Sequence, residues 1–337
     1  MSLYEDMFGL VGALGSHLRQ GHAAGAAQLG APHGGTPASA TISALGGSAI
    51  GGSLAEALWR DSLRTPTVVN RAAALPGWIG PGHLVIPISY SGATAETVAA
   101  AREALARGAD VIAVTAGEPL AALVRTGGGR VVSVPGGLPP RAALGTLFGA
   151  LTAALEHAGV IGPAGNDLRA AAHACDAVAA DRGGSLASEL GEAVATTTTW
   201  VYGHGPLSAV ARRFKCQLNE NAKSTAAFGE LPEADHNEIV GWAGTTRAGG
   251  RHAALHLSDP DDPPTVRASI ATTPRLIGDD AAFHRILTGQ GQTRTARVFW
   301  LLSLLDHVSV YTAKAAGVDP YEIDRIAELK QALAAAT

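Results

Sequence analysis

Two short turns rich in glycine and hydroxyl side chains carry the residues best suited to hold an anion. The first lies in residues 44–53, ALGGSAIGGS, between an apolar run and a helix-like stretch at 53–60. Glycine places no side chain between backbone and ligand, and a strand-to-helix turn directs free N–H groups and a positive helix end into one space. We therefore expect Gly46, Gly47 and Ser48 to contact a phosphate, although four glycines within 46–52 also suit a purely structural tight turn.

A second turn of the same kind follows residues 84–90, LVIPISY, a run that is typical of a buried strand. Its hydroxyl groups belong to Ser89, Ser91 and Thr94, and a helical pattern begins directly afterwards. These hydroxyls can fill the positions around a phosphate that backbone donors leave open. Because two strand ends carry such turns, phosphate binding is favoured over a merely structural role.

The elements that must position these turns alternate along the first half of the chain. After an N-terminal helix predicted at 3–28, we expect strands at 41–45, 67–70, 84–89, 111–115 and 131–134, and helices at 53–60, 94–107, 119–125 and 141–158. Strands that alternate with helices predict a parallel sheet covered on both faces, with ligands at the carboxyl ends of the strands. Both turns lie at such ends.

A second α/β unit is expected after the glycine- and proline-containing stretch 159–166, GVIGPAGN. Its expected elements are helix 168–180, strand 199–203, helix 207–221, strands 253–257 and 273–277, and helix 294–316. The sequence thus predicts one unit over 1–160, which includes the N-terminal helix and the phosphate turns, and another over 161–337, which ends in a long helix.

Composition narrows the possible partners. The 337 residues carry a net charge of −4, with 47% apolar and 16% charged residues, which is typical of a compact protein and offers no basic surface to nucleic acid or acidic lipid. Two cysteines, Cys175 and Cys216, predict buried, reduced thiols rather than disulfides or a thiolate metal site. The N-terminus lacks a signal-peptide layout and no apolar run suits a membrane span, so we expect a cytoplasmic protein.

The two turns resemble the phosphosugar loops of the sugar isomerase (SIS) domain family, and the whole chain resembles the bifunctional phosphoglucose/phosphomannose isomerases. The motifs that carry the resemblance are GGSAIGG at 46–52, SYSGATAET at 89–97, PPRAALG at 139–145, LNENAK at 218–223 and DHNEIVGW at 235–242. The resemblance implies an α/β fold of two facing SIS subdomains, each a mostly parallel sheet flanked by helices. It also implies a homodimer with shared active sites.

The activity implied by the resemblance is conversion of glucose 6-phosphate, mannose 6-phosphate or both to fructose 6-phosphate through a cis-enediolate, without a metal or other cofactor. Glu220 would be the proton-transferring base, His236 would open the sugar ring in the neighbouring subunit's site, and Arg141 would stabilise negative charge. The residue types suit these tasks, because burial raises the pKa of a carboxylate and imidazole titrates near neutrality. Glu230 and Glu233 are the nearest competitors of Glu220.

A lysine in the C-terminal helix also lies near the substrate in the wider isomerase family, with glutamine or threonine seven residues before it. We assign this lysine to Lys314, which places His307 at the earlier position. An imidazole there departs from the family and would either help to open the ring or narrow the pocket for one epimer. Ser309 and Thr312 restore a hydroxyl if the alignment shifts.

Two functions remain possible, an enzyme and a non-catalytic phosphosugar-binding protein. A non-catalytic SIS protein that binds or senses a phosphosugar is favoured by His307 and by Ala93 and Ala95, which replace the usual residues of the phosphate loop. The presence of both proposed catalytic groups favours an enzyme instead. A metal site is not expected, since His252 and His256 lie in a strand-like run without an HExxH pattern.

Overall fold

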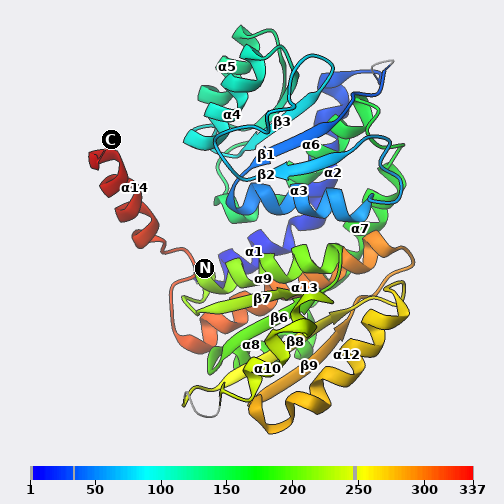
Figure 1. Cartoon of the computed structure of the whole chain (residues 1–337). Coiled ribbons are helices and arrows are strands. Elements are labelled where there is room, and N and C mark those ends of the chain that lie inside the picture. Colours follow the sequence, from blue (N-terminus) through cyan, green and yellow to red (C-terminus); the bar gives the residue numbers. More distant parts are fainter. Residues whose placement is uncertain (1–2, 33–34, 246–248, 337) are drawn as a thin grey trace.

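The computed structural model describes residues 3–32, 35–245 and 249–336 and contains two parallel β-sheets, each flanked by helices (Figure 1). The first sheet has the strand order β2-β1-β3-β4-β5, and every neighbouring pair is parallel. Its strands are β1 (Ala40–Ala44), β2 (Thr67–Asn70), β3 (Leu84–Ser89), β4 (Asp110–Thr115) and β5 (Arg130–Ser133). This arrangement confirms the α/β class expected from the sequence.

Both faces of the first sheet are covered, which explains why β3 is buried along its whole length. Ile42 and Ile86 share one core with the helices α3 and α6, whereas Val85 and Val111 share another with α4 and α5. The helices are α1 (Leu3–Gly12), α2 (Leu14–Leu29), α3 (Gly46–Leu58), α4 (Ala95–Ala106), α5 (Glu118–Thr126) and α6 (Leu144–His157). Alternate residues of each strand therefore supply two separate apolar layers.

The second sheet has the order β7-β6-β8-β9 and is also parallel throughout. Its strands are β6 (Thr198–Gly203), β7 (Ala226–Glu230), β8 (His252–Ser258) and β9 (Phe283–Thr288). The α-helices that follow in the described residues are α7 (Gly165–Ala180), α8 (Gly184–Ala195), α9 (Pro206–Asn221), α10 (Glu238–Trp242), α12 (Pro264–Ile277), α13 (Arg294–Ala316) and α14 (Asp324–Ala336). Helices α9 and α13 lie between the two sheets, and α9 packs against α3 of the first unit (Figure 1).

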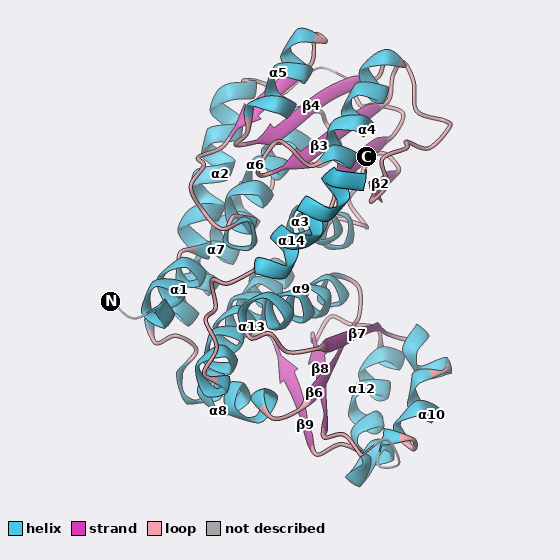
Figure 2. Cartoon of the chain, turned by 90° about the vertical axis from the view of Figure 1, so that its left-hand side faces the viewer, coloured by secondary structure: helices cyan, strands magenta, loops and turns pink. Residues whose placement is uncertain are grey.

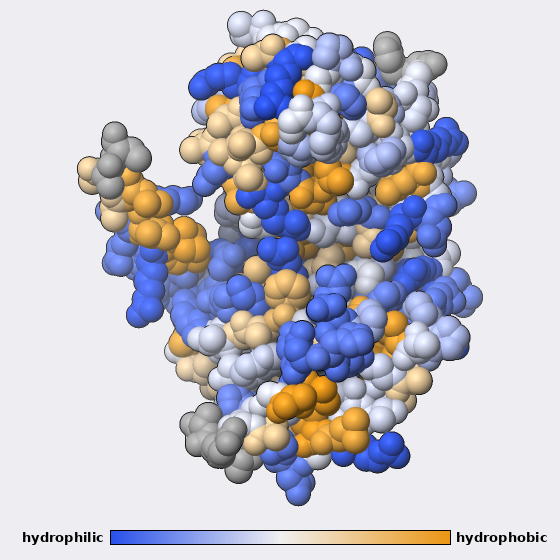
Figure 3. All heavy atoms as spheres, viewed as in Figure 1, coloured by the Kyte–Doolittle hydropathy of each residue, from blue (hydrophilic) through white to orange (hydrophobic). Residues whose placement is uncertain are grey.

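The last helix, α14, stands apart from the body of the molecule (Figures 1 and 2). Apolar side chains lie along it, and Ile326, Leu329 and Leu333 are 40%, 59% and 57% exposed (Figure 3). Among the described residues, no helix is both long enough and apolar enough to cross a membrane.

Several predicted elements are wrong in type or extent. Residues 273–277 are the last turn of α12 and not a strand, because Val266, Ile270, Thr273 and Ile277 are buried at helical spacing. The missing strand is β9, whose polar sequence FHRILT is only partly buried and gives a weak strand pattern. Strand β7 is also missing from the expected elements.

The N-terminal helix is also different from the prediction. It divides at Ala13 into two helices, of which α2 packs against α6 and α7 while α1 packs mainly against α13. The helix expected from residue 53 begins at Gly46, so the glycine-rich stretch is the first half of α3 rather than an open turn. The helix expected from 141 begins as the 3-10 turn η1 (Pro140–Ala142) before α6.

The second sheet places a buried imidazole, His256, against a half-buried one, His284. β8 confirms the strand expected across His252 and His256, and His256 is 1% exposed and stacks on Tyr202. Its Nδ1 lies 3.3 Å from Nε2 of His284 on β9. Burial, together with the neighbouring imidazole, lowers the pKa of His256 to about 3, and burial also lowers the pKa of His284.

This pair predicts a loss of stability in mild acid. A histidine whose folded pKa lies below its unfolded value of about 6.5 stabilises the fold above that pH and stops doing so as the pH falls. Between pH 6.5 and 5.5, protonation of His256 in the unfolded state should lower the free energy of unfolding by about 1 kcal/mol. Urea unfolding at the two pH values should therefore show a smaller loss for His256→Phe than for wild type. The exposed His173 is the control, and an equal benefit from His173→Phe would contradict this assignment.

Candidate active site

The two glycine- and hydroxyl-rich segments, the start of α3 and the turn after β3, follow neighbouring strands at the centre of the first sheet. β1 pairs with β3, yet the chain passes through β2 between them, so the turns after β1 and β3 flank the point where the strand order reverses. Open parallel sheets bind ligands in the crevice at this point, outside the carboxyl ends of the strands. The structure thus brings Gly46, Gly47 and Ser48 to the same edge as Ser91 and Thr94.

The first turn presents the amino end of α3 at this edge. Gly46 has φ +53°, in the left-handed region that favours glycine, and opens the helix. The N–H groups of the first helical turn lack partners within the helix and suit an anion. Gly52 has another role: a Cβ there would lie 2.9 Å from the Ile42 side chain, so this glycine lets α3 pack closely on the sheet.

The second turn is organised by its own hydroxyl groups. Ser89 is buried at the end of β3, and its Oγ lies 2.9 Å from Oγ1 of Thr94, the residue before α4. The Ser91 hydroxyl accepts a hydrogen bond from the Ala93 N–H at 3.3 Å and is otherwise exposed. Ser91 and Thr94 therefore stand at the surface of the crevice, and Ser89 supports Thr94 from below.

Arg141 is held in η1, next to the first turn. A Cβ at Gly47 would lie 3.9 Å from the carbonyl oxygen of Pro140, which places this segment against the amino end of α3. The Arg141 side chain is only 5% exposed, and its Nη1 lies 3.5 Å from Oε2 of Glu220. Burial lowers the pKa of Arg141, whereas the negative charge of Glu220 opposes that shift.

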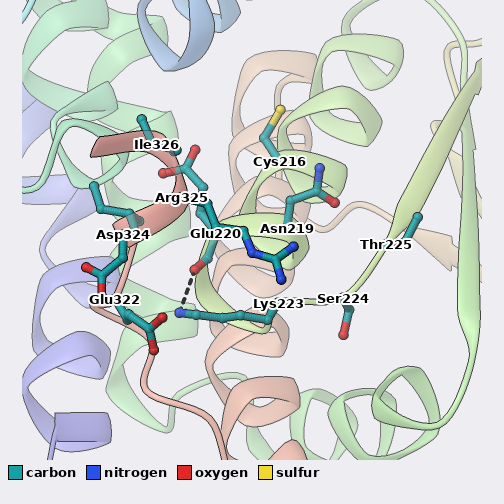
Figure 4. Close-up of a pocket in the computed structure, with 11 residues that line it drawn as sticks. Cys216, Asn219, Glu220, Lys223, Ser224, Thr225, Glu322, Asp324, Arg325 and Ile326 are labelled. Carbon is teal, nitrogen blue, oxygen red and sulfur yellow. Dashed lines mark hydrogen bonds between the residues drawn. The ribbon is translucent and has the colours of Figure 1, made fainter. Parts of the chain in front are cut away.

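Glu220 lies near the carboxyl end of α9 with its side chain 32% exposed. It lines a cavity of about 640 Å³ between the end of α9, the following turn and the beginning of α14 (Figure 4). Lys223 faces the same cavity, and its Nζ donates to the Glu220 carbonyl oxygen at 3.0 Å and to the Asp319 carbonyl oxygen. Cys216, half-buried rather than buried as expected, also lines the cavity.

Three residues to which the resemblance assigns a role do not line the Glu220 cavity. His236 is exposed at the end of the 3-10 turn Glu233–His236, beside the second sheet, and is not among the residues that line the cavity. His307 is completely buried on α13, where Nδ1 lies 2.8 Å from the Ser303 carbonyl oxygen and the ring stacks on Phe8 of α1.

Lys314 is exposed two turns after His307, and its charge lowers the pKa of Glu5 on α1 together with the larger effect of Arg182. His307 and Lys314 therefore lie on the side of α13 that faces α1. Within the described part of the chain, neither lines the cavity. The competitors Glu230 and Glu233 are both exposed.

Buried polar residues of α9 and α13 to which the sequence assigned no role lie behind Arg141 and Glu220. Asp306 forms a buried ion pair with Arg213 of α9, at 2.6 Å from Nη2, and Arg213 also donates to the Arg141 carbonyl oxygen at 3.0 Å. Two polar neighbours of Glu220 also belong here. Asn221 contacts Arg141, and Lys223 lines the cavity. The available signal was their place in the motif LNENAK, where only the glutamate received a role.

The fold and the paired turns define a SIS-domain protein. A family model described as "SIS domain" matches residues 62–125, and one described as "Bacterial phospho-glucose isomerase C-terminal SIS domain" matches residues 184–333. The C-terminal domain of glucosamine-fructose-6-phosphate aminotransferase from Francisella tularensis shares the fold, with a TM-score of 0.65 and 14% identity over 95% of this chain and 98% of that one.

Curated relatives identify the family more closely. A bifunctional phosphoglucose/phosphomannose isomerase from Caldicellulosiruptor bescii is 34% identical over 81% of this chain and 83% of its own. The enzyme of the same name from Aquifex aeolicus is 31% identical over 81% and 82%. The chain belongs to the bifunctional phosphoglucose/phosphomannose isomerase family.

The buried ion pair behind the site predicts a large stability effect. Asp306→Ala leaves the Arg213 guanidinium buried without its carboxylate, which should lower the free energy of unfolding by about 3–5 kcal/mol. Urea denaturation at neutral pH measures this change. The exposed Asp61 is the control, because Asp61→Ala should change stability by less than about 0.5 kcal/mol. Equal effects of the two substitutions would show that the pair does not hold α9 to α13.

Proposed function

We propose that this protein is an aldose–ketose isomerase that interconverts glucose 6-phosphate and mannose 6-phosphate with fructose 6-phosphate. The relatives from C. bescii and A. aeolicus carry the name of this dual activity. The observation that carries the proposal is the placement of a half-exposed carboxylate, Glu220, beside the buried guanidinium of Arg141 at the edge of a cavity. A base next to a fixed cation is what proton transfer through an enediolate requires.

The phosphate of the substrate would bind at the crevice of the first sheet. Backbone N–H groups at Gly46, Gly47 and Ser48 and the hydroxyls of Ser91 and Thr94 would donate to its oxygens, with Ser89 holding Thr94 in place. Support comes from the position of both turns at the reversal of strand order and from the unpaired N–H groups that a helix start offers. This binding would hold the sugar chain in one orientation for the chemical step.

In the proposed reaction, Glu220 removes the C2 proton of the open-chain aldose phosphate, and electrons move to the carbonyl oxygen to give a cis-enediolate. Arg141 stabilises the oxygen that becomes negative. The protonated Glu220 then returns the proton to C1, and the hydroxyl proton passes from O2 to O1. The ketose therefore forms with no net gain or loss of protons. Lys223 places a second cation in the same cavity, and its ammonium group donates to the Glu220 carbonyl oxygen.

His236 would open the sugar ring in a neighbouring copy of the chain. Its exposure and its absence from the lining of the Glu220 cavity support a role in another subunit's site. The protein would then be a homodimer with shared sites. The roles of His307 and Lys314 remain predictions that rest on the resemblance alone. His307 is buried against Phe8 and Lys314 lies near Glu5, so neither takes part in this reaction scheme. The cytoplasmic location likewise remains a prediction.

Glu220→Gln tests the proposed base. The amide keeps the size of the side chain but cannot accept the C2 proton, so turnover should fall about 10²–10⁴-fold for both aldose phosphates. The measurement is a coupled assay that follows fructose 6-phosphate formed from glucose 6-phosphate and, separately, from mannose 6-phosphate. Glu230 is an exposed glutamate on β7, so Glu230→Gln is the matched control and should retain activity.

The outcomes of this assay separate the candidate functions. Wild-type turnover of one epimer alone would restrict the proposal to that sugar. Wild-type protein that binds hexose phosphate and converts neither epimer would instead favour the sensing function, for which Ala93 and Ala95 in the phosphate loop are the sequence argument.

Shared active sites predict complementation between inactive variants. Glu220→Gln and His236→Ala damage different sides of a site that two subunits build together. When equal amounts are unfolded, mixed and refolded, half of the dimers should be mixed and should each contain one intact site, so activity should recover to about a quarter of wild type. Each variant refolded alone is the control. No recovery in a mixture shown to be dimeric would place His236 and Glu220 in the same chain's site.

A further inference from the structure

The Arg141 guanidinium is fixed by partners that the proposed reaction does not use. Nε donates to Oδ1 of Asn221 at 2.7 Å, and Nη2 donates to the Pro320 carbonyl oxygen at 2.6 Å. Nη1 has only the long contact of 3.5 Å to Glu220. The nitrogen that faces Glu220 is therefore the one left available for a substrate oxygen, and the orientation of the group depends on the other two.

Asn221 is itself held by α13. It is completely buried, and its Nδ2 donates to the Ser309 hydroxyl at 2.9 Å. The Ser309 hydroxyl, also completely buried, donates in turn to the Asp306 carbonyl oxygen at 2.6 Å. Because Ser309 offers its lone pairs to the amide, the N–H₂ of Asn221 must point toward α13 and its oxygen toward Arg141. The hydrogen-bond chain from α13 thus determines which way the amide faces.

We propose that Asn221 is a positioning residue for the isomerase reaction, oriented by Ser309, and that it holds the Arg141 guanidinium where the enediolate oxygen forms. This inference rests on the proposed function. Arginine has many rotamers, and a displacement of about 1 Å at a reacting centre lowers rates about 10²-fold. Without Asn221, Nε loses its buried acceptor, and the guanidinium keeps only the bonds from Nη2 to the Pro320 and Tyr321 carbonyl oxygens and the long contact of Nη1 to Glu220.

The expected effect is on the chemical step rather than on substrate binding, because the phosphate turns lie in other segments. Asn221→Ala should lower kcat about 30–100-fold and change KM less than about threefold. Ser309→Ala removes only the group that orients the amide and should lower kcat about 3–10-fold. Both constants are measured for fructose 6-phosphate in the direction of glucose 6-phosphate, and thermal unfolding confirms that each variant is folded.

Ser303→Ala is the matched control. Ser303 lies on the same helix, is equally buried and is hydrogen-bonded to no described residue through its hydroxyl. It should keep kcat within about twofold of wild type. A loss equal to that of Ser309→Ala would overturn the inference, since any cavity on α13 would then have the same effect.

A double-mutant cycle distinguishes positioning from general damage. If Asn221 acts through Arg141, then adding Asn221→Ala to Arg141→Ala should lower kcat no further. The inference is overturned if Asn221→Ala lowers kcat by the same factor in both backgrounds, or if it raises KM alone. If Asn221→Ala does not fold, the same cycle with Ser309→Ala decides. Wild-type protein without turnover would instead overturn the proposed function, and the positioning role with it.

Discussion

The need to pair a buried guanidinium shapes the centre of this molecule. Arg141 brings together three segments that are remote in sequence: η1, the end of α9 and the connection between α13 and α14. A second buried arginine, Arg213, binds the Arg141 carbonyl oxygen and a carboxylate of α13. An unpaired charge in the interior costs free energy, so loss of any one of these contacts would destabilise the others. The two halves of the chain are therefore joined at the place where the proposed chemistry occurs.

The first sheet presents backbone and hydroxyl donors at one edge, in a protein that has no excess of basic residues. Its strand order places two turns on either side of the reversal, and each turn supplies backbone or hydroxyl donors. A protein with a net charge of −4 can hold a phosphate in this way, because the donors are local and oriented. In the proposed mechanism, phosphate binding and proton transfer therefore depend on different segments of the chain.

Sequence reasoning was most accurate where local pattern and tertiary environment agree. Strands β1 and β3 are buried along their whole length, as expected when both faces of a sheet are covered, and α13 has the predicted bounds. It was wrong for β9, which is partly exposed and polar, and for the end of α12, where β-branched residues at 3.6-residue spacing were read as a strand. It also missed the break between α1 and α2, since nothing local requires the two helices to pack on different partners.

The sequence alone determined the class of fold and the family, because motifs and periodicity are local properties that can be read without knowledge of contacts. It also named Glu220 and Arg141, which the structure places 3.5 Å apart. Only the tertiary structure decided that Asn221, Ser309 and Asp306 stand behind them, and that His307 and Lys314 lie on the side of α13 toward α1. Most of α13 is buried on nearly every side, so the spacing of its residues does not show which side faces the site; that depends on how α13 packs with several other helices.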